Sequence, residues 1–239
     1  MKQLFVVFMT VGALGLLACE NVDSEDVMTD GIYADINAIA TGDGNTTVRA
    51  SLRVGGNASN TFLELVGDDK LVASMGEETA EMGEKTFLGS KWYTAEFSED
   101  AVDTEFNVAF ERSVDEPAPE SKMTMVAPFD ITVPASSASY SRASDDIELA
   151  WETSGTSDTM LVNIDGSCVQ LYHEDLSGDT GSFSVVAGTL EPAQDQEDET
   201  CSITIELIRH REGTLDPAYG EGGLVYSRQI RTIQVTSAP

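Results

Sequence analysis

Apolar and polar residues alternate along most of this chain of 239 residues, and this period of two constrains the fold more than any other feature. In residues 48–54, alternate apolar side chains share one face of an extended strand, while Arg49, Ser51 and Arg53 take the other face. Turn residues recur about every 8–12 residues, and no long helical pattern appears. The pattern therefore predicts an all-β protein made of antiparallel strands.

The alternating segments fall into two halves, separated by a short break. Pro117 and Pro119 stand among charged residues there, and two prolines cannot continue a central strand. We therefore expect a linker at residues 115–127, between a first β-sandwich at 31–114 and a second at 128–236. A hydrophobic fraction of 41% is enough to build two cores.

The second half is similar to an immunoglobulin domain in having a tryptophan on an early strand and a pair of cysteines. Trp151 precedes both Cys168 and Cys201, however, whereas true immunoglobulin domains place the tryptophan between them. We expect two antiparallel immunoglobulin-like β-sandwich domains as an architecture, without membership of that superfamily.

The N-terminus is typical of a secretory signal. Lys2 is followed by an apolar run at 4–17, which is too short to span a bilayer of about 30 Å comfortably. The run ends in Leu16-Leu17-Ala18-Cys19, which resembles the lipobox of bacterial lipoproteins. The resemblance implies a signal peptide at 1–18, cleavage before Cys19, and fatty acylation of that cysteine.

This resemblance also implies a location. Residues 19–30 carry no apolar periodicity, so we expect the lipidated cysteine to be followed by a flexible tether. Lipoproteins with Asp after the cysteine tend to stay at the inner membrane, and Glu20 stands here instead, which favours the outer membrane. The periplasmic and cell-surface sides both stay open, and a plain secreted protein is the alternative.

The number of cysteines and the net charge limit the possible covalent links and partners of the chain. Lipidation would leave Cys168 and Cys201 as a pair in an oxidising compartment, so we expect a disulfide between them. The formal net charge is −29, and such a field repels nucleic acid, which we exclude as a partner.

Nothing in the sequence indicates catalysis. The only histidines are His173 and His210, and no Gly-x-Ser-x-Gly elbow provides a nucleophile for either. Among 42 acidic residues, some pair will always have the spacing used by glycosidases, so that pattern carries no weight. We therefore predict no catalytic residue, no cofactor and no enzyme.

Calcium is the one metal that acidic loops of this kind suit. The candidates are Asp68 with Asp69, Asp175 with Asp179, and the run at 195–199. None has the spacing of a known calcium loop, and a solvated acidic loop explains them better. We therefore assign no metal site.

Three residues are possible ligand contacts. Trp92 lies opposite the apolar face of Tyr93 and Ala95, so it is either exposed or covered by the other domain. Asp216 and Tyr219 belong to the loop at 215–223, whose Leu-Asp-Pro-x-aromatic-Gly stretch resembles one found in bacterial repeat proteins of propeller type. A single copy makes no propeller, but such a loop could bind a partner.

Four arginines fall on the last two expected strands. They could form a small basic patch, but the better explanation is that they pair with carboxylates on neighbouring strands. They are Arg209, Arg211, Arg228 and Arg231.

The sequence leads to a hypothesis of a non-catalytic outer-membrane lipoprotein, held to the membrane by its lipid anchor, that acts as a binding or scaffold module. Its partner would be an envelope protein or an extracellular ligand. Two alternatives stay open: a carbohydrate-binding or hydrolytic accessory lipoprotein, and a passive acidic coat protein.

Overall fold

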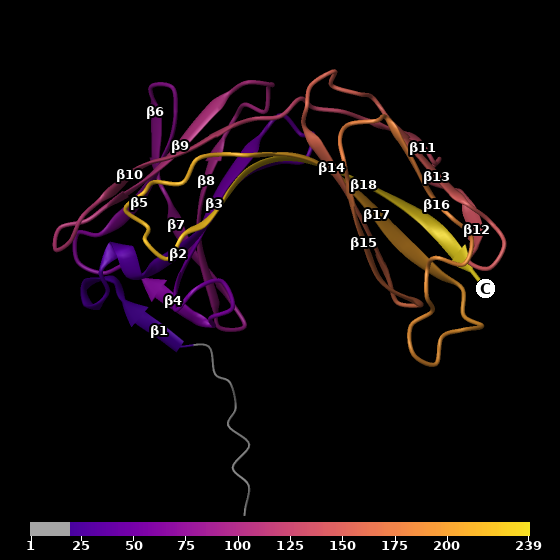
Figure 1. The fold of residues 1–239 in the computed structure, drawn as a ribbon, viewed down its shortest axis with the longest axis horizontal. Coiled ribbons are helices and arrows are strands. Elements are labelled where there is room, and N and C mark those ends of the chain that lie inside the picture. Colours follow the sequence, from indigo (N-terminus) through magenta and orange to yellow (C-terminus); the bar gives the residue numbers. More distant parts are fainter. Residues whose placement is uncertain (1–19) are drawn as a thin grey trace, which may run out of the picture.

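The structure is a computed structural model that describes residues 20–239, and over these residues the protein is built from β-strands and two short 3₁₀ turns (Figure 1). This confirms the all-β class. The expected signal peptide at 1–18 and the expected lipidation site, Cys19, lie outside the described residues. Among residues 20–239, no helix is long and apolar enough to cross a membrane.

The strands divide between two lobes. The N-terminal lobe holds β1 (Glu20–Asp23), β2 (Ile32–Ala40), β3 (Thr46–Val54), β4 (Thr61–Glu64), β5 (Lys70–Met75), β6 (Glu78–Glu81), β7 (Gly83–Phe87), β8 (Ser90–Phe97), β9 (Glu105–Glu111) and β10 (Ala118–Thr124). The C-terminal lobe holds β11 (Ile131–Val133), β12 (Ser139–Ser141), β13 (Ile147–Trp151), β14 (Thr159–Gly166), β15 (Val169–Leu176), β16 (Ser182–Val185) and β17 (Cys201–Glu212). The last strand, β18 (Gly223–Ala238), belongs to both.

One long sheet runs through both lobes. Its 11 strands include the path β1-β4-β3-β2-β18-β17-β14-β15, and β7 joins it through β8. The first half of β18 pairs in parallel with β2, from Gly223 beside Ala34 to Gln229 beside Ala40, while antiparallel pairing with β17 runs along most of β18, from Tyr226 to Ser237. Figure 1 shows the result as an arch, in which β17 and β18 cross from one lobe to the other.

Gly223 is required for the close approach of β18 to β2. A Cβ atom at this position would lie 2.0 Å from the carbonyl oxygen of Ala34, far inside van der Waals contact. Glycine is the residue that permits such contact between two backbones. The join between the lobes therefore begins at a position where no other side chain fits.

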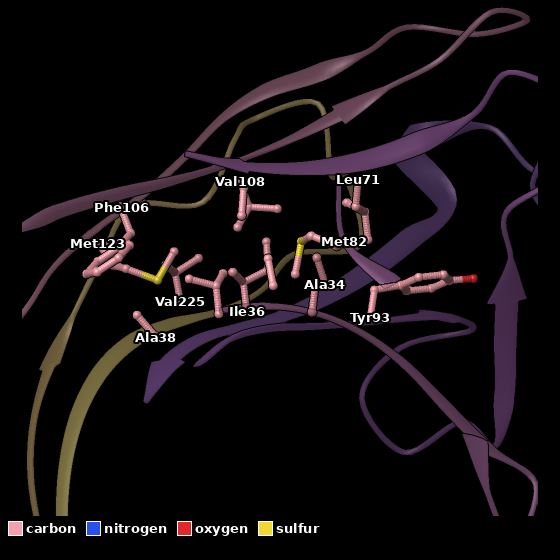
Figure 2. Packing of buried hydrophobic residues seen from close by; sticks show 14 of the residues in the cluster. Ala34, Ile36, Ala38, Leu71, Met82, Tyr93, Phe106, Val108, Met123 and Val225 are labelled. Carbon is pink, nitrogen blue, oxygen red and sulfur yellow. The ribbon is translucent and has the colours of Figure 1, made fainter. Parts of the chain in front are cut away.

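A smaller sheet covers the outer side of each lobe. In the N-terminal lobe, β10-β9-β5-β6 packs on the long sheet, and the two faces enclose the first core. Figure 2 shows Ala34 and Ile36 of β2 below Leu71 and Val108 of the smaller sheet. These four side chains are almost completely buried, and each large apolar one contributes roughly 1.5–3 kcal/mol by leaving water.

The C-terminal lobe has immunoglobulin-like topology. Its first, third and sixth strands form the sheet β11-β13-β16, which faces the β12-β18-β17-β14-β15 part of the long sheet. β12 pairs in parallel with the end of β18, as the first strand of such sandwiches pairs with the last. Trp151 of β13 is 4% exposed in this second core, as its alternation with Ile147 and Leu149 predicts.

The expected disulfide is present. Cys168 and Cys201 are bonded, with their Cα atoms 5.8 Å apart. Cys168 lies in the turn between β14 and β15, and Cys201 begins β17, so both cysteines belong to one sheet. The bond differs in this from the disulfide between sheets of antibody domains.

Two expected boundaries are wrong. Residues 118–124 of the expected linker form β10, and Pro119 fits there because β10 is an edge strand of its sheet, with β9 as its one neighbouring strand. The expected flexible tether also folds from Glu20 onward. β1 pairs with β4, and Ser24 and Thr29 are buried because the Arg112 guanidinium binds the carbonyl of Ser24 and the hydroxyl of Thr29.

The division into residues 31–114 and 128–236 also needs correction at its C-terminal end. Tyr219 and Val225 are buried in the core of the N-terminal lobe. The chain returns to that lobe between β17 and β18, so the two lobes share their last strands and are not sequential domains.

Arg209 lies at the point where the lobes meet. Its side chain is fully buried, with Nη2 3.0 Å from the Asp179 carboxylate. Nη1 donates to the carbonyl oxygens of Ala127 and Pro128, at 2.8 and 3.1 Å, in the segment that joins β10 to β11. The guanidinium also lies 4.7 Å from the centre of the Phe129 ring. One cation thus ties β17 to the connection between the lobes.

Further polar contacts cross the junction. The Arg211 guanidinium binds Asp158 of the C-terminal lobe at 2.7 Å and reaches Asp103 of the N-terminal lobe at 3.5 Å. Gln229 of β18 donates to the carbonyl oxygen of Asp100 at 2.9 Å. These bonds stabilise one relative placement of the lobes.

Burial alone would raise the pKa of the Asp179 carboxyl. The hydrogen bonds from Ser154 and from the Trp151 indole, together with the charge of Arg209, outweigh burial and hold this pKa below its ordinary value. The carboxylate is therefore charged at neutral pH and compensates Arg209.

Removing the disulfide should destabilise the protein. Bonded Cys168 and Cys201 are 33 residues apart, and restraining a loop of this size in the unfolded chain corresponds to about 3–4 kcal/mol. We expect the Cys168→Ser/Cys201→Ser variant to unfold at lower denaturant concentration, measured by circular dichroism in urea. Reductant should shift the wild type by the same amount and leave the variant unchanged; coincident wild-type and variant curves would contradict the prediction.

Replacing Arg209 by methionine should cost about 3–5 kcal/mol, because the Asp179 carboxylate would remain buried without its cation. The measurement is again the unfolding free energy in urea. Arg228→Met is the matched control, since Arg228 is only partly buried on the adjacent strand, and should change it by less than about 1 kcal/mol. Equal losses in the two variants would argue against a special role for Arg209.

Candidate binding face

The long sheet has one face on the two cores and one open face. In the N-terminal lobe, strand alternation puts three arginines and three aromatic residues on the open side, opposite buried neighbours such as Ala50 and Tyr93. We call this set the cationic–aromatic face: Tyr33, Arg49, Arg53, Trp92, Tyr226 and Arg228. Because both smaller sheets lie on the outer side of the arch, this face lines its inner side (Figure 1).

Arg49 and Trp92 form the best-defined contact on this face. The guanidinium carbon of Arg49, on β3, lies 4.6 Å from the centre of the Trp92 ring, on β8. This distance allows a cation–π interaction of about 0.5–1 kcal/mol at an exposed site. Trp92 is half-buried as a result, and the expectation that it lies opposite the core is confirmed.

The other two arginines of the face each lie against an aromatic ring as well. Arg53 lies over the Phe62 ring at 5.7 Å and donates to the carbonyl oxygen of Asn57 at 2.6 Å. Arg228 lies 5.3 Å from the Tyr226 ring. Burial, and next the carboxylate of Asp35, raise the pKa of the Tyr33 hydroxyl, which stays neutral and can donate a hydrogen bond.

His210 extends the face toward the C-terminal lobe. Its ring lies 5.6 Å from that of Tyr226, and Nε2 is 2.9 Å from the hydroxyl of Thr159. Burial lowers the pKa of this imidazole, and the nearby charge of Arg228 lowers it further. The histidine is therefore neutral at pH 7 and leaves the positive charge to the arginines.

A shallow hollow of about 420 Å³ continues the open face on the C-terminal lobe. It is lined by Asn163, Asp165, Leu171, Thr204 and Glu206, from β14, β15 and β17. The amide of Asn163 donates to the Glu206 carboxylate at 2.9 Å. The open face thus changes from cationic and aromatic on one lobe to acidic on the other.

Asp216 and Tyr219 do not form a surface site. Tyr219 is 3% exposed and its ring stacks on Phe110 at 6.5 Å, inside the N-terminal core. Asp216 is buried too, and its carboxylate accepts from the backbone N–H groups of Glu120 and Ala218. The loop at 215–223 packs into the N-terminal lobe. The expectation that Asp216 and Tyr219 are ligand contacts is therefore wrong, and both are packing residues.

The four late arginines divide between pairing and stacking. Arg209 and Arg211 bind Asp179 and Asp158, as expected of pairs with carboxylates. Arg231 instead lies 5.4 Å from the Phe129 ring, and Arg228 stacks on Tyr226. Only Arg228 joins the cationic–aromatic face.

Two of the calcium candidates, Asp69 and Asp179, are bound to arginines. Asp69 accepts from Arg112 at 3.1 Å and from the N–H of Ser113 at 3.0 Å, and Asp179 is bound to Arg209. Within residues 20–239, no group of three or more acidic, histidine or cysteine side chains is placed to hold a metal ion.

Neither histidine lies beside a serine that it could activate among the contacts of the described chain. His173 is exposed and contacts Asn163 at 2.8 Å and Asp175 at 3.4 Å. His210 contacts Thr159, whose hydroxyl also donates to the carbonyl of His210 at 3.3 Å. This geometry provides no nucleophile with a third orienting group.

Sequence reasoning missed the buried cations. Arg112, Arg142 and Lys91 are all largely buried, and each is bound to several oxygen atoms. Arg142, for example, donates to the carbonyl oxygens of Glu197 and Glu199 at 3.0 Å each. A buried arginine leaves no mark in a pattern of apolar residues, so the periodicity could not have found it.

No protein-family model matches this chain, and no curated protein matches it either. Among solved structures, it is similar to the FN1–FN3 domains of chicken CNTN1, at 11% identity and a TM-score of 0.29 over 93% of this chain and 66% of that one. It is also similar to the fibronectin(III)-like modules of Clostridium thermocellum CbhA, at 11% identity and a TM-score of 0.26, over 86% and 90% of the two chains.

A third match is Bacteroides ovatus SGBP-B, solved in complex with a mixed-linkage heptasaccharide, at 9% identity and a TM-score of 0.20 over 97% and 68% of the two chains. TM-scores this low do not establish a common arrangement. The carbohydrate ligand is a property of that protein alone.

Removing Arg49 should uncover the Trp92 ring. In a Trp151→Phe background, Trp92 is the single tryptophan of the chain, and Arg49→Ala should shift its emission to longer wavelength and increase quenching by acrylamide. The change in unfolding free energy should stay below about 1 kcal/mol. Arg53→Ala is the control, because Arg53 covers Phe62 instead; the same spectral change in both variants would disprove the contact.

Proposed function

We propose that this protein is a non-catalytic outer-membrane lipoprotein that acts as a binding or scaffold module in the cell envelope. The lipobox-like Leu16-Leu17-Ala18-Cys19 supports the lipid anchor, and Glu20 after it supports the outer membrane. The disulfide between Cys168 and Cys201 is compatible with an oxidising compartment.

The observation that carries the binding function is the cationic–aromatic face. The chain has 42 acidic and 13 basic residues, yet three arginines and three aromatic rings gather on one open sheet surface. Such groups suit a partner that presents carboxylates beside apolar side chains. We infer an acidic segment of an envelope protein as the partner.

The junction supports a scaffold role. A surface that spans two lobes binds one partner with a fixed geometry only if the lobes do not move independently. Buried Arg209 and the strand β18, which is hydrogen-bonded in both lobes, restrain that movement. The protein then loses less conformational entropy when it binds its partner.

The carbohydrate alternative draws less support from the structure. Sugar rings stack on an open aromatic face, and here the guanidinium of Arg49 covers one side of the Trp92 ring. The strands place no second exposed tryptophan beside it, because Trp151 is buried.

The test is capture of a partner from native envelope with the lipidated protein. We expect stoichiometric recovery of one envelope protein at low salt, and at least tenfold weaker recovery with Arg49→Glu/Arg228→Glu. The matched control, Lys70→Glu/Lys122→Glu, makes the same charge change on β5 and β10 of the outer sheet and should bind normally. Equal loss in both variants, or recovery that does not weaken with salt, would reject this face as the site.

A further inference from the structure

The chain enters the N-terminal lobe at one end of the long sheet. Glu20, bonded directly to Cys19, pairs with Thr61 at the start of β4, and β4 follows the loop after β3. Figure 1 draws β1 and β4 together at the foot of this lobe. The end of β3 and the first described residue therefore lie at the same end of the sheet.

The tip of the β7–β8 hairpin lies at that end too. β8 pairs with β3 from Thr46 beside Phe97 to Ala50 beside Tyr93, and the Ser51 hydroxyl of β3 donates to the carbonyl oxygen of Lys91 at 3.2 Å, so β8 begins near the end of β3. Ser90 pairs with Phe87 across the turn. The tip thus projects beyond the end of β3.

This tip is apolar and exposed. Phe87 is 66% exposed and Leu88 is 84% exposed, side by side at the turn. Leu88 has a φ of 48° and Gly89 a φ of 84°. A two-residue turn with both φ values positive favours Asn or Asp followed by Gly, and leucine is costly in that position. Turn preference therefore does not account for leucine at this position.

The charges near the tip permit contact with a membrane. Lys85 is exposed two residues before Phe87. The Lys91 ammonium binds the carboxylates of both Glu64 and Glu84, at 2.9 and 3.1 Å, and compensates one of these two negative charges, while Lys85 offsets the other. Repulsion from an anionic lipid surface is accordingly weaker at this end than the overall charge of −29 suggests.

We propose that Phe87 and Leu88 insert into the interface of the same bilayer that holds the lipid on Cys19, and thereby seat the N-terminal lobe on the membrane. The proposal rests on the lipid anchor of the proposed function. Two exposed apolar side chains bind a bilayer weakly alone, but a covalent anchor at the same end of the sheet keeps them near its surface. The lipid on Cys19 and the hairpin tip then contact the membrane together, which restricts the rotation of the lobe about its anchor.

The test uses the full lipidated protein in vesicles of phosphatidylethanolamine and phosphatidylglycerol. An environment-sensitive fluorophore is attached at Leu88→Cys, or at Leu171→Cys as the control, since Leu171 is 71% exposed on the other lobe. We expect at least a twofold rise in emission on vesicle binding at position 88, with quenching by nitroxide-labelled lipids, and no such change at 171.

A second measurement avoids the label. Amide hydrogen exchange across residues 85–90 should be at least threefold slower in the vesicle-bound protein than in Cys19→Ser in solution. The Phe87→Ser/Leu88→Asn variant keeps a residue that tolerates positive φ at the turn, so the hairpin should fold and the protection should disappear.

The outcomes separate the two proposals. Acyl mass and flotation with vesicles, together with a probe at 88 that behaves like the probe at 171, would overturn membrane insertion of the tip and leave the anchor intact. Absence of acyl mass on Cys19 would overturn both.

Discussion

The arrangement of the whole molecule depends on the buried charge of Arg209. Transferring a guanidinium from water into a protein interior is strongly unfavourable unless its charge and its N–H groups are matched. Asp179 supplies the charge, and the carbonyl oxygens of Ala127 and Pro128 accept from the same side chain. These partners come from different segments, so they bind the two Nη groups of Arg209 together only when the connection between the lobes follows one path.

The same chemistry recurs where the chain is irregular. Arg112 binds the N-terminal segment through the carbonyl oxygen of Val27 at 2.9 Å, and Arg142 binds carbonyl oxygens of the acidic loop before β17. Irregular segments bury few apolar side chains in a core, whereas their backbone carbonyls are good acceptors for arginine. An acidic chain with few cations places several of them inside, and the arginines of the cationic–aromatic face are distinctive because they lie on an open sheet surface instead.

The sequence predicts the strands that have one buried face and fails for the others. β2, β3, β8 and β17 follow the alternation because each packs one side on a core. β7 was not predicted, because all of its residues are exposed and no alternation exists to detect. β10 falls in the expected linker because Pro117 and Pro119 interrupt the pattern there, and an edge strand tolerates the one proline that lies within it, Pro119.

The sequence likewise predicts some candidate site residues correctly and fails for others. Strand parity placed Trp92 opposite the core correctly, because parity is a local property of the backbone. Tyr219 could not be placed in this way, since its burial depends on the return of the chain to the N-terminal lobe after β17. That return is a property of topology, which a pattern of period two does not encode.

Together, the two proposals fix how far the cationic–aromatic face lies from the membrane surface. Ser90 begins β8 at the tip that we assign to the membrane, and Trp92 follows two residues later, which is about 7 Å along the strand. The face then continues across β3 and β2 to β18, toward the top of the arch. An acidic partner bound to Arg49 and Arg228 would therefore lie close to the bilayer at one end and against the C-terminal lobe at the other. This geometry favours a partner that is itself attached to the envelope, because a membrane-bound segment reaches both ends of the face without leaving the surface.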